Sequence, residues 1–357
     1  MEKIALKNLS LPELDNWFAE LDEPSYRVKQ IRDWIYRKGV FDFAAMSNLP
    51  AALRERLNET ATLRSLDAVE SLSSERDGSE KILFRLEDGE TIESVRMGME
   101  SHSTLCLSSQ VGCAMGCVFC ETGRWGFRRN LKQAEILDQV LELRAKLPEG
   151  QRYNLVFMGM GEPLQNYATL VSTLRVLTSE EGMGLSPRRI TLSTVGLPDR
   201  IRKLAGEGMK VGLAVSLVCG DDDMRRALVP GHVKQTIKPI LEAAEYYARV
   251  TGRRATLEYV LMAGITDRPK DAERLREITR DRPFKVNIIP YNPGETEVQM
   301  LLPGFKAPEQ LRRPTPSEVE KFVGKLIPAV PAVTVRWSQG TEVGGACGQL
   351  RGREANG

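Results

Sequence analysis

Apolar side chains in the first part of the chain recur at helical spacing. In residues 11–21, Leu14, Trp17 and Phe18 fall three or four positions apart, which places them on one face of a helix. Pro24 is a favourable start for a second helix, and a third short helix is expected after residue 50. These periods predict a small helical accessory domain, to which we assign residues 1–75.

A different pattern follows in residues 82–97. Residues 82–86 and 91–97 are rich in β-forming side chains, and the turn-forming pair Asp88-Gly89 lies between them. This arrangement predicts a β-hairpin. We assign residues 76–100 to a hairpin linker that carries Glu93.

Expected strands alternate with expected helices between residues 101 and 340. The strands are expected at residues 104–108, 153–158, 189–193, 211–217, 256–261 and 285–290, and the helices at residues 133–147, 167–177, 199–206, 236–248 and 269–279. Repeated strand–helix units build a parallel sheet, and six of them form an incomplete version of the eight-stranded TIM barrel. We therefore predict an α/β fold, a six-fold partial barrel with its site at the carboxyl ends of the strands. Residues 292–316 are expected to form a long loop, and residues 341–357 a C-terminal loop.

Composition narrows the class of protein. The 357 residues are 41% apolar and 27% charged, as in globular proteins that bury a full core. No apolar run approaches the roughly 20 residues of a transmembrane helix, and the N-terminus lacks the apolar core of a secretory signal. The net charge of +2 does not by itself indicate nucleic-acid binding. We expect a cytoplasmic protein with no membrane partner, whose six cysteines stay reduced.

Three of those cysteines follow the first expected barrel strand. Cys113, Cys117 and Cys120 form the motif C-x3-C-x2-C. Three thiolates from one loop can hold three irons of a [4Fe–4S] cluster. The fourth iron can then bind S-adenosylmethionine (SAM), a cofactor of radical chemistry. A zinc site is an alternative, although structural zinc prefers four ligands, and three unrelated cysteines are another.

Several stretches besides the cysteine motif carry a family resemblance. They are CLSSQVGC at residues 106–113, GFRRNL at 126–131, MGMGEPL at 158–164, LSTVG at 192–196, IPYNP at 289–293 and ACGQL at 346–350. At these positions the chain resembles the radical-SAM superfamily and, within it, the RlmN/Cfr type of RNA adenosine methyltransferases. The resemblance is closest to the dual-specificity enzymes that methylate adenosine C2, and it runs from about residue 6 to residue 352.

The resemblance implies a covalent relay with two SAM molecules per turnover. Cys347 receives a methyl group from one SAM, and a second SAM, reduced at the cluster, supplies a radical that activates this methyl group. The resulting carbon adds to adenine C2, and Glu93 removes the ring proton. Cys106 then attacks the sulfur of Cys347, and a disulfide releases the methylated base.

The resemblance also implies a SAM-binding set. Its members lie at strand ends: Gly161, Glu162, Ser193, Ser216, Leu217, Val218 and Asn292. One position departs from the family, which usually has Ser-Leu-His-Ala after the fourth barrel strand. Here Val218 stands at the place of the histidine.

The partners implied by the resemblance are RNA and an electron donor. The expected substrates are 23S rRNA and, as a second candidate, tRNA, and the donor is a low-potential protein such as flavodoxin or ferredoxin. Cations and aromatic side chains interleave at residues 124–129, as stacking on unpaired bases requires. Residues 27–38 and 249–254 form two further basic clusters. We expect the adenine to be unpaired or flipped out when it reacts.

Three other functions stay open at this stage. One is a C8-methylating relative of the antibiotic-resistance type. Another is a paralogue that acts on another RNA, which the loss of the histidine at Val218 would allow. The last is a non-catalytic RNA-binding protein with a structural metal.

Overall fold

The structure is a computed structural model, and it describes residues 3–99, 101–232, 235–327, 329–330 and 332–352. The predicted C-terminal loop of residues 341–357 is therefore described only as far as Gly352, and its last five residues lie outside the described part. No described helix is long and apolar enough to cross a membrane.

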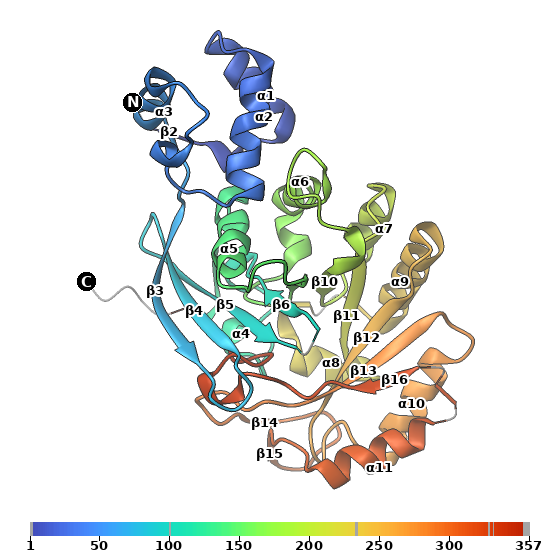
Figure 1. The fold of residues 1–357 in the computed structure, drawn as a ribbon. Helices are drawn as coiled ribbons and strands as arrows, with labels where there is room; N and C mark the ends of the chain where they lie inside the picture. Colours follow the sequence, from blue (N-terminus) through green and yellow to red (C-terminus); the bar gives the residue numbers. More distant parts are fainter. Residues whose placement is uncertain (1–2, 100, 233–234, 328, 331, 353–357) are drawn as a thin grey trace.

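The N-terminal residues form the expected helices: α1 (Leu11–Glu20), α2 (Ser25–Arg32) and α3 (Ala51–Thr60). Ser10 and Glu13 cap the first of them reciprocally, which satisfies backbone N–H groups that have no partner inside the helix. Leu14, Phe18 and Ile31 are buried. Two short parallel strands, β1 (Ile4–Ala5) and β2 (Ala61–Thr62), close the domain, which stands beside α5 and α6 in Figure 1.

A ten-stranded sheet with the order β16-β13-β12-β11-β10-β9-β6-β5-β4-β3 forms the centre of the molecule. Its six consecutive parallel strands are β6 (Ser103–Cys106), β9 (Tyr153–Phe157), β10 (Ile190–Thr194), β11 (Gly212–Val218), β12 (Ala255–Leu261) and β13 (Phe284–Pro290). They confirm the predicted six-fold partial barrel. A seventh parallel strand, β16 (Val333–Val335), pairs with β13 and was not predicted. At three residues it is too short to show a period.

The other side of the sheet is antiparallel and consists of β3 (Leu66–Ser73), β4 (Glu80–Leu86) and β5 (Thr91–Gly98). The hairpin of β4 and β5 is present as predicted. It is not a separate linker, however, because β5 pairs with β6 and so continues the barrel sheet. Residues 66–73, which we assigned to the helical domain, form an edge strand. Most of β3 is exposed, so its sequence lacks the alternation that signals a half-buried strand.

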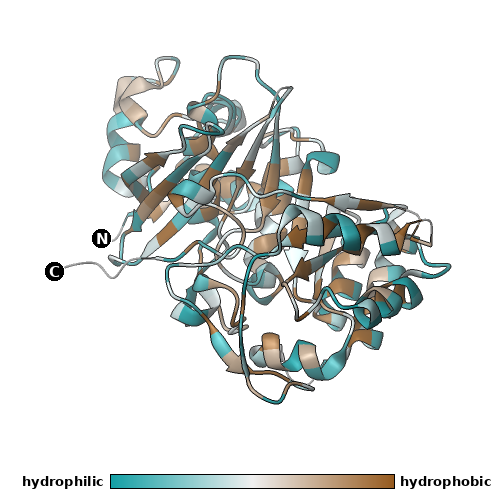
Figure 2. Ribbon diagram, turned by 90° about the horizontal axis from the view of Figure 1, so that it is seen from below, coloured by the Kyte–Doolittle hydropathy of each residue, from teal (hydrophilic) through white to brown (hydrophobic). Residues whose placement is uncertain are grey.

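Helices cover the outside of the sheet in Figure 1. The five predicted ones are α5 (Gln133–Ala145), α6 (Tyr167–Thr178), α7 (Pro198–Gly206), α9 (Ile237–Thr251) and α10 (Pro269–Thr279), and α4 (Glu121–Trp125), α8 (Asp222–Leu228) and α11 (Pro316–Leu326) are additional. Short single turns lie at Leu6–Asn8, Asp33–Arg37, Phe43–Ala45, Pro163–Asn166, Pro187–Arg189, Pro230–His232 and Thr341–Val343. Figure 2 shows hydrophobic residues concentrated on the strands and hydrophilic ones on the outer helices.

Two small antiparallel pairs complete the fold. β7 (Gln110–Gly112) pairs with β8 (Phe127–Asn130) on either side of the cysteine motif. β14 (Gln299–Leu301) pairs with β15 (Pro308–Gln310) inside residues 292–316, which the sequence predicted to be an unbroken loop. Strands of three or four residues, as these are, are too short to show a periodic pattern in the sequence.

A buried ion pair joins the helical domain to the barrel. The ammonium of Lys7 contacts the carboxylate of Asp138 on α5, and both side chains are almost completely buried. The same carboxylate accepts the backbone N–H of Ser65 at 2.8 Å. Lys7 also lies over the ring of Phe41, 4.2 Å from its centre. The N-terminal domain is therefore fixed against the barrel at a point that water does not reach.

Replacing Lys7 with methionine tests this anchor. Asp138 would then be a buried charge without its cation, so we expect the free energy of unfolding to fall by about 3–5 kcal/mol. Urea denaturation followed by circular dichroism measures the loss. The double variant Lys7→Met/Asp138→Leu removes both charges and is expected to recover most of it. A single variant as stable as the native chain would show that the pair does not anchor the domain.

Candidate active site

A cavity of about 170 Å³ lies where the parallel strands end. Of the predicted site residues, Cys113, Cys117, Cys120, Gly161, Glu162, Ser193, Ser216, Val218, Asn292 and Cys347 line it. Leu217, Cys106 and Glu93 do not. Residues from the cysteine loop, from four strand ends and from the C-terminal segment thus meet in one space.

The cysteine motif lies in the loop between β7 and α4. This loop packs tightly against α4, since a Cβ at Gly123 in that helix would lie 2.7 Å from the backbone nitrogen of Cys117. The backbone N–H of Cys120 donates to the carbonyl of Cys117 at 3.1 Å. Burial raises the pKa of the Cys113 thiol to about 12 and also raises that of Cys117 well above its usual value. Thiolates in such surroundings need a positive charge beside them, which iron supplies.

Glu162 is a buried carboxyl group held by backbone donors. Its Oε2 accepts the N–H of Val195 at 2.8 Å, and its Oε1 accepts the N–H of Leu164 at 3.0 Å. Burial raises the pKa of Glu162 to about 7, although these hydrogen bonds oppose the rise. The preceding Gly161 has φ +102°, and a Cβ there would lie 2.6 Å from the side chain of Gln110. Only glycine fits at this turn, which aims the carboxyl group at the cavity.

Val218 has the left-handed backbone that β-branched residues rarely adopt, with φ +70°. The N–H of Cys219 donates to the carbonyl of Leu217 at 2.9 Å, so Val218 is the centre of a γ-turn of the strained type. The turn ends β11 and leaves Val218 on the cavity wall, while Leu217 packs into the core. On the neighbouring strand, Ser193 Oγ lies 3.5 Å from Ser216 Oγ.

Arg225 on α8 fixes this turn, and the sequence analysis did not single it out. Its Nε donates to the carbonyl of Leu217 at 3.1 Å and its Nη2 to that of Ser216 at 3.4 Å. Nη2 also donates to the carbonyl of Val195. One buried guanidinium thus joins the carboxyl ends of β10 and β11. One arginine among many charged residues gives no such signal in sequence.

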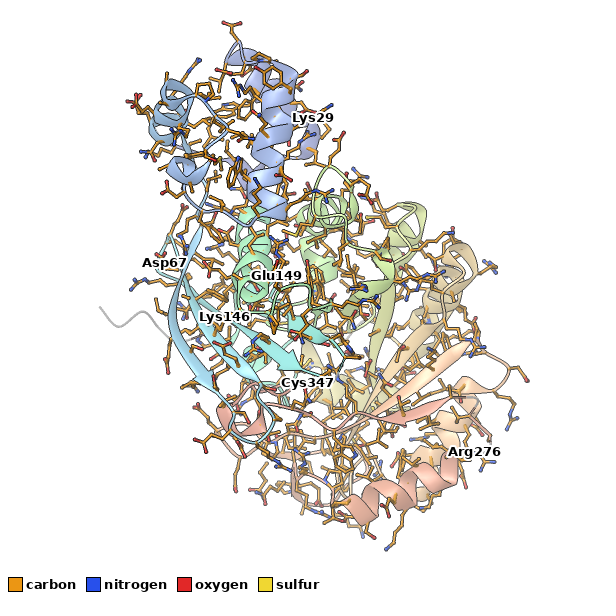
Figure 3. The ribbon with its side chains drawn as sticks, viewed as in Figure 1. Lys29, Asp67, Lys146, Glu149, Arg276 and Cys347 are labelled. Carbon is orange, nitrogen blue, oxygen red and sulfur yellow. The ribbon has the colours of Figure 1, made fainter. Side chains whose placement is uncertain are left out.

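The C-terminal segment closes the cavity. The Asn292 amide Nδ2 donates to the carbonyl of Cys347 at 3.1 Å and to Ser338 Oγ at 2.8 Å. The N–H of Glu121 donates to the carbonyl of Gly348 at 2.8 Å. The glycine-rich segment is therefore held by hydrogen bonds from two sides. Figure 3 labels Cys347 near the middle of the molecule, well away from Lys29 on the N-terminal helices.

Cys347 also lines a second cavity, of about 80 Å³, on whose wall Cys106 lies. Burial raises the pKa of Cys106 to about 12, and the nearby Cys347 adds to the rise while Arg336 opposes it. Arg336 follows β16, and its Nη1 lies 3.0 Å from Met158 Sδ. This partly buried cation beside both thiols is a candidate functional residue that was not predicted from the sequence.

Glu93 lies on β5, behind the C-terminal segment. Its Oε1 pairs with Lys81 Nζ at 2.9 Å, and its Oε2 accepts the N–H of Arg351 at 2.9 Å. Further along, a Cβ at Gly345 would lie 3.5 Å from Val95. The segment from Gly345 to Arg351 thus runs alongside β5. In this arrangement Glu93 lies beneath the segment and lines neither cavity.

Comparison with known proteins identifies the family. The radical SAM superfamily matches residues 107–276, and the ribosomal RNA large subunit methyltransferase N-terminal domain matches residues 4–63. A probable dual-specificity RNA methyltransferase RlmN from Rhodopirellula baltica is 44% identical over 97% of this chain and 90% of its own. The chain belongs to the RlmN family of radical-SAM methyltransferases.

Two further relatives agree. The dual-specificity RNA methyltransferase RlmN of Syntrophotalea carbinolica is 40% identical over 98% of this chain and 90% of its own. The crystal structure of a radical SAM methyltransferase from Sphaerobacter thermophilus has a TM-score of 0.90 at 40% identity, and the match covers 98% of this chain and 99% of that one. The predicted family and fold class are therefore confirmed.

The family uses a [4Fe–4S] cluster and SAM, as the cysteine motif predicted. Among the described residues, no three cysteine, histidine or carboxylate side chains converge on a single metal position. A cube-shaped cluster does not require this, because each thiolate binds a different iron. The cavity beside the three thiols has a mainly apolar wall with polar groups from several strand ends, among them Glu162, Ser193 and Asn292. Such a wall suits a cofactor that has both apolar and polar parts.

The predicted stacking cluster at residues 124–129 has its cations paired. Arg124 contacts Glu121 at 3.0 Å, and Arg128 contacts Glu90 at 3.1 Å. Arg129 contacts Glu135 at 2.9 Å and Asp88 as well. These carboxylates offset the positive charge that the sequence shows at this place.

Substitutions at Val218 test the strain in the γ-turn. A Cβ in the left-handed region costs about 1–2 kcal/mol, and glycine avoids this cost. We therefore expect Val218→Gly to be at least as stable as Val218→Ala in chemical denaturation. At Val215, on the same strand and not among the positive-φ residues, glycine is expected to be less stable than alanine by about 1 kcal/mol. If the alanine variant is the more stable one at both positions, the backbone of Val218 is not strained.

Proposed function

We propose that this protein methylates C2 of an adenosine in 23S rRNA, with tRNA as a second substrate, through a methyl group carried on Cys347. One observation carries the proposal: Cys347 lies in the wall between two cavities. The first cavity holds the three cysteines of the radical-SAM motif, and the second holds Cys106. A methyl carrier that receives its group on one side and delivers it on the other needs such a position.

The first cavity is the proposed cofactor site. Cys113, Cys117 and Cys120 would bind the cluster, which together with SAM supplies a carbon radical able to take a hydrogen atom. The SAM-binding set is expected at the strand ends: Gly161, Glu162, Ser193, Ser216, Leu217, Val218 and Asn292. Glu162 is suited to the SAM ammonium group, because a positive charge beside this buried carboxyl group favours its ionised form.

Leu217 and Val218 would contribute differently from the other members. Leu217 points into the core, so only its backbone is available, and its carbonyl is already held by Arg225. Val218 offers an apolar wall where the family usually has histidine. Contact between Val218 and SAM is therefore by packing rather than by a side-chain hydrogen bond.

Cys347 and Cys106 would share the covalent steps. Cys347 receives the methyl group, whose carbon becomes bonded to adenine C2. Cys106 then attacks the sulfur of Cys347, which forms an S–S bond and breaks the bond from that sulfur to the transferred carbon. The electron pair of the broken bond stays with the carbon and the adenine ring, and the carbon takes up a proton to become the methyl group. Arg336 favours the attack, because its charge opposes the effect of burial on the Cys106 pKa.

Glu93 is the proposed base for the proton on adenine C2. Its carboxylate lies on β5, two residues from Val95, which pairs directly with Cys106. Because the N–H of Arg351 binds this carboxylate, the C-terminal segment must shift before Glu93 can reach the base. The ion pair with Lys81 does not involve this segment and can remain in place.

The RNA substrate is supported by the relatives and by the accessory domain. Both RlmN relatives cited above are named dual-specificity RNA methyltransferases. The N-terminal residues match a domain named for methyltransferases of large-subunit ribosomal RNA. A low-potential donor such as flavodoxin or ferredoxin would reduce the cluster.

Anaerobic turnover with SAM, a low-potential reductant and protein-free 23S rRNA tests the proposal, with nucleosides read by mass spectrometry. The native chain is expected to form 2-methyladenosine. Cys347→Ala removes the methyl carrier, so we expect no methylated adenosine. Cys106→Ala leaves the transferred carbon bonded to Cys347, so a protein–RNA crosslink is expected to accumulate.

Cys219→Ala is the matched control. Cys219 is also buried, but it lines neither cavity, so the variant is expected to keep its activity. An 8-methyladenosine product would keep the relay and overturn the C2 assignment. Full activity of Cys347→Ala would overturn the relay itself.

A further inference from the structure

The second cavity has an aromatic side chain at its edge. Trp337 and Met99 both line it, and 48% of Trp337 and 42% of Met99 are exposed. The same cavity reaches Cys106 and Cys347 on its inner side. A flat group that enters from the surface would therefore pass the indole and come to the two thiols.

Unpaired nucleobases are flat groups of this kind. Proteins bind them by stacking on aromatic side chains, and the apolar face of an indole suits every base. The thioether of Met99 adds a polarisable contact beside the ring. Stacking alone gives affinity without selecting one base, so a selective pocket needs a polar group as well.

Gln339 provides such a group. Its Oε1 is buried and has no hydrogen-bond partner among the described residues. Its Nε2 donates to the carbonyl of Gly98 at 3.4 Å and to Met99 Sδ at 3.8 Å. A thioether sulfur is a weak acceptor, so a ring nitrogen of a bound base can replace it as the partner of this N–H. Glutamine amides pair with the N6 and N7 positions of adenine, where one donor and one acceptor lie side by side.

Pairing at N6 and N7 also orients the ring. C2 lies on the opposite side of the purine from this edge, whereas C8 is bonded to N7. A base held by Gln339 in this way turns C2 away from the amide and keeps C8 close to it. The contact therefore selects adenine and favours reaction at C2 over C8.

We propose that the second cavity is the pocket for the target adenine, that Trp337 stacks on this base, and that Gln339 binds its amino edge. The proposal rests on the proposed function and names its substrate contacts. It also replaces the stacking role that the sequence suggested for residues 124–129. Phe127 in that stretch is 45% exposed, but it lines neither cavity.

Binding of a fluorescein-labelled RNA hairpin with one unpaired adenosine in a uridine loop tests the proposal. Fluorescence anisotropy is measured with the cluster-loaded protein and SAM, without reductant, so that no turnover occurs. Trp337→Ala is expected to weaken binding about 5- to 150-fold, as the loss of one stacked base does. Trp337→Phe keeps a ring and is expected to retain most of the affinity. Phe127→Ala is the matched control and is expected to bind as the native chain does.

A second hairpin, with purine riboside in place of adenosine, tests Gln339. Purine riboside lacks the N6 amino group but still stacks. The native chain is expected to prefer adenosine at least 5-fold, and Gln339→Ala is expected to bind both hairpins equally. Native-like thermal unfolding of each variant shows that a loss of binding is not a loss of fold.

The proposal is overturned if Trp337→Ala binds like the native chain, if Phe127→Ala is weakened as much, or if the native chain does not distinguish the two hairpins. The outcome is separate from that of the proposed function. Adenosine selectivity that depends on Trp337 and Gln339 in a protein that forms no methylated product would support the pocket and refute the methylation. Methylation by a protein in which these variants do not affect binding would support the proposed function and refute the pocket.

Discussion

The hydrogen bond from Asn292 to the carbonyl of Cys347 sets the geometry on which the rest of the site depends. Asn292 follows β13, so this contact ties a glycine-rich segment at the end of the chain to the rigid end of the barrel. A glycine-rich segment has high conformational entropy and would not hold one position without such contacts. With the contact, the Cys347 side chain becomes a shared wall of the two cavities.

Burial governs the chemistry of the groups around that wall. It raises the pKa of Glu162 and of the motif cysteines, which makes each of them dependent on a nearby positive charge. The chain supplies one buried and one partly buried guanidinium group in this region. Arg225 is occupied by backbone carbonyls and orders the strand ends, whereas Arg336 lies beside Cys106 and Cys347, the two thiols of the proposed relay. The first is therefore a structural cation, whereas the second lies where the proposed covalent steps would take place.

The distribution of positive charge does not by itself indicate where this protein would bind RNA. The basic stretch at residues 124–129 is matched by carboxylates from the hairpin and from α5. The groups suited to binding a base are instead the exposed indole of Trp337 and the Gln339 side chain, whose buried Oε1 has no hydrogen-bond partner among the described residues. Shape and hydrogen bonding at a cavity can select one base on a chain whose net charge is only +2.

The sequence by itself determined the features that depend on near neighbours. The periods of apolar residues gave the six parallel strands, five of the covering helices and the hairpin of β4 and β5. The spacing of Cys113, Cys117 and Cys120 gave the cluster motif. Very short strands such as β16 and the exposed edge strand β3 were missed, because neither carries a periodic pattern.

Only the tertiary structure decided which distant residues meet. Cys106 and Cys347 are separated by 241 positions (347 − 106) and come to one cavity because β5, β6 and the C-terminal segment pack together. Tertiary packing also sets the surroundings of Arg336 and Gln339 and the strained turn at Val218, so none of the three was predicted from the sequence. Local sequence patterns report the conformation of a segment, whereas a site between segments is fixed by how the whole sheet closes.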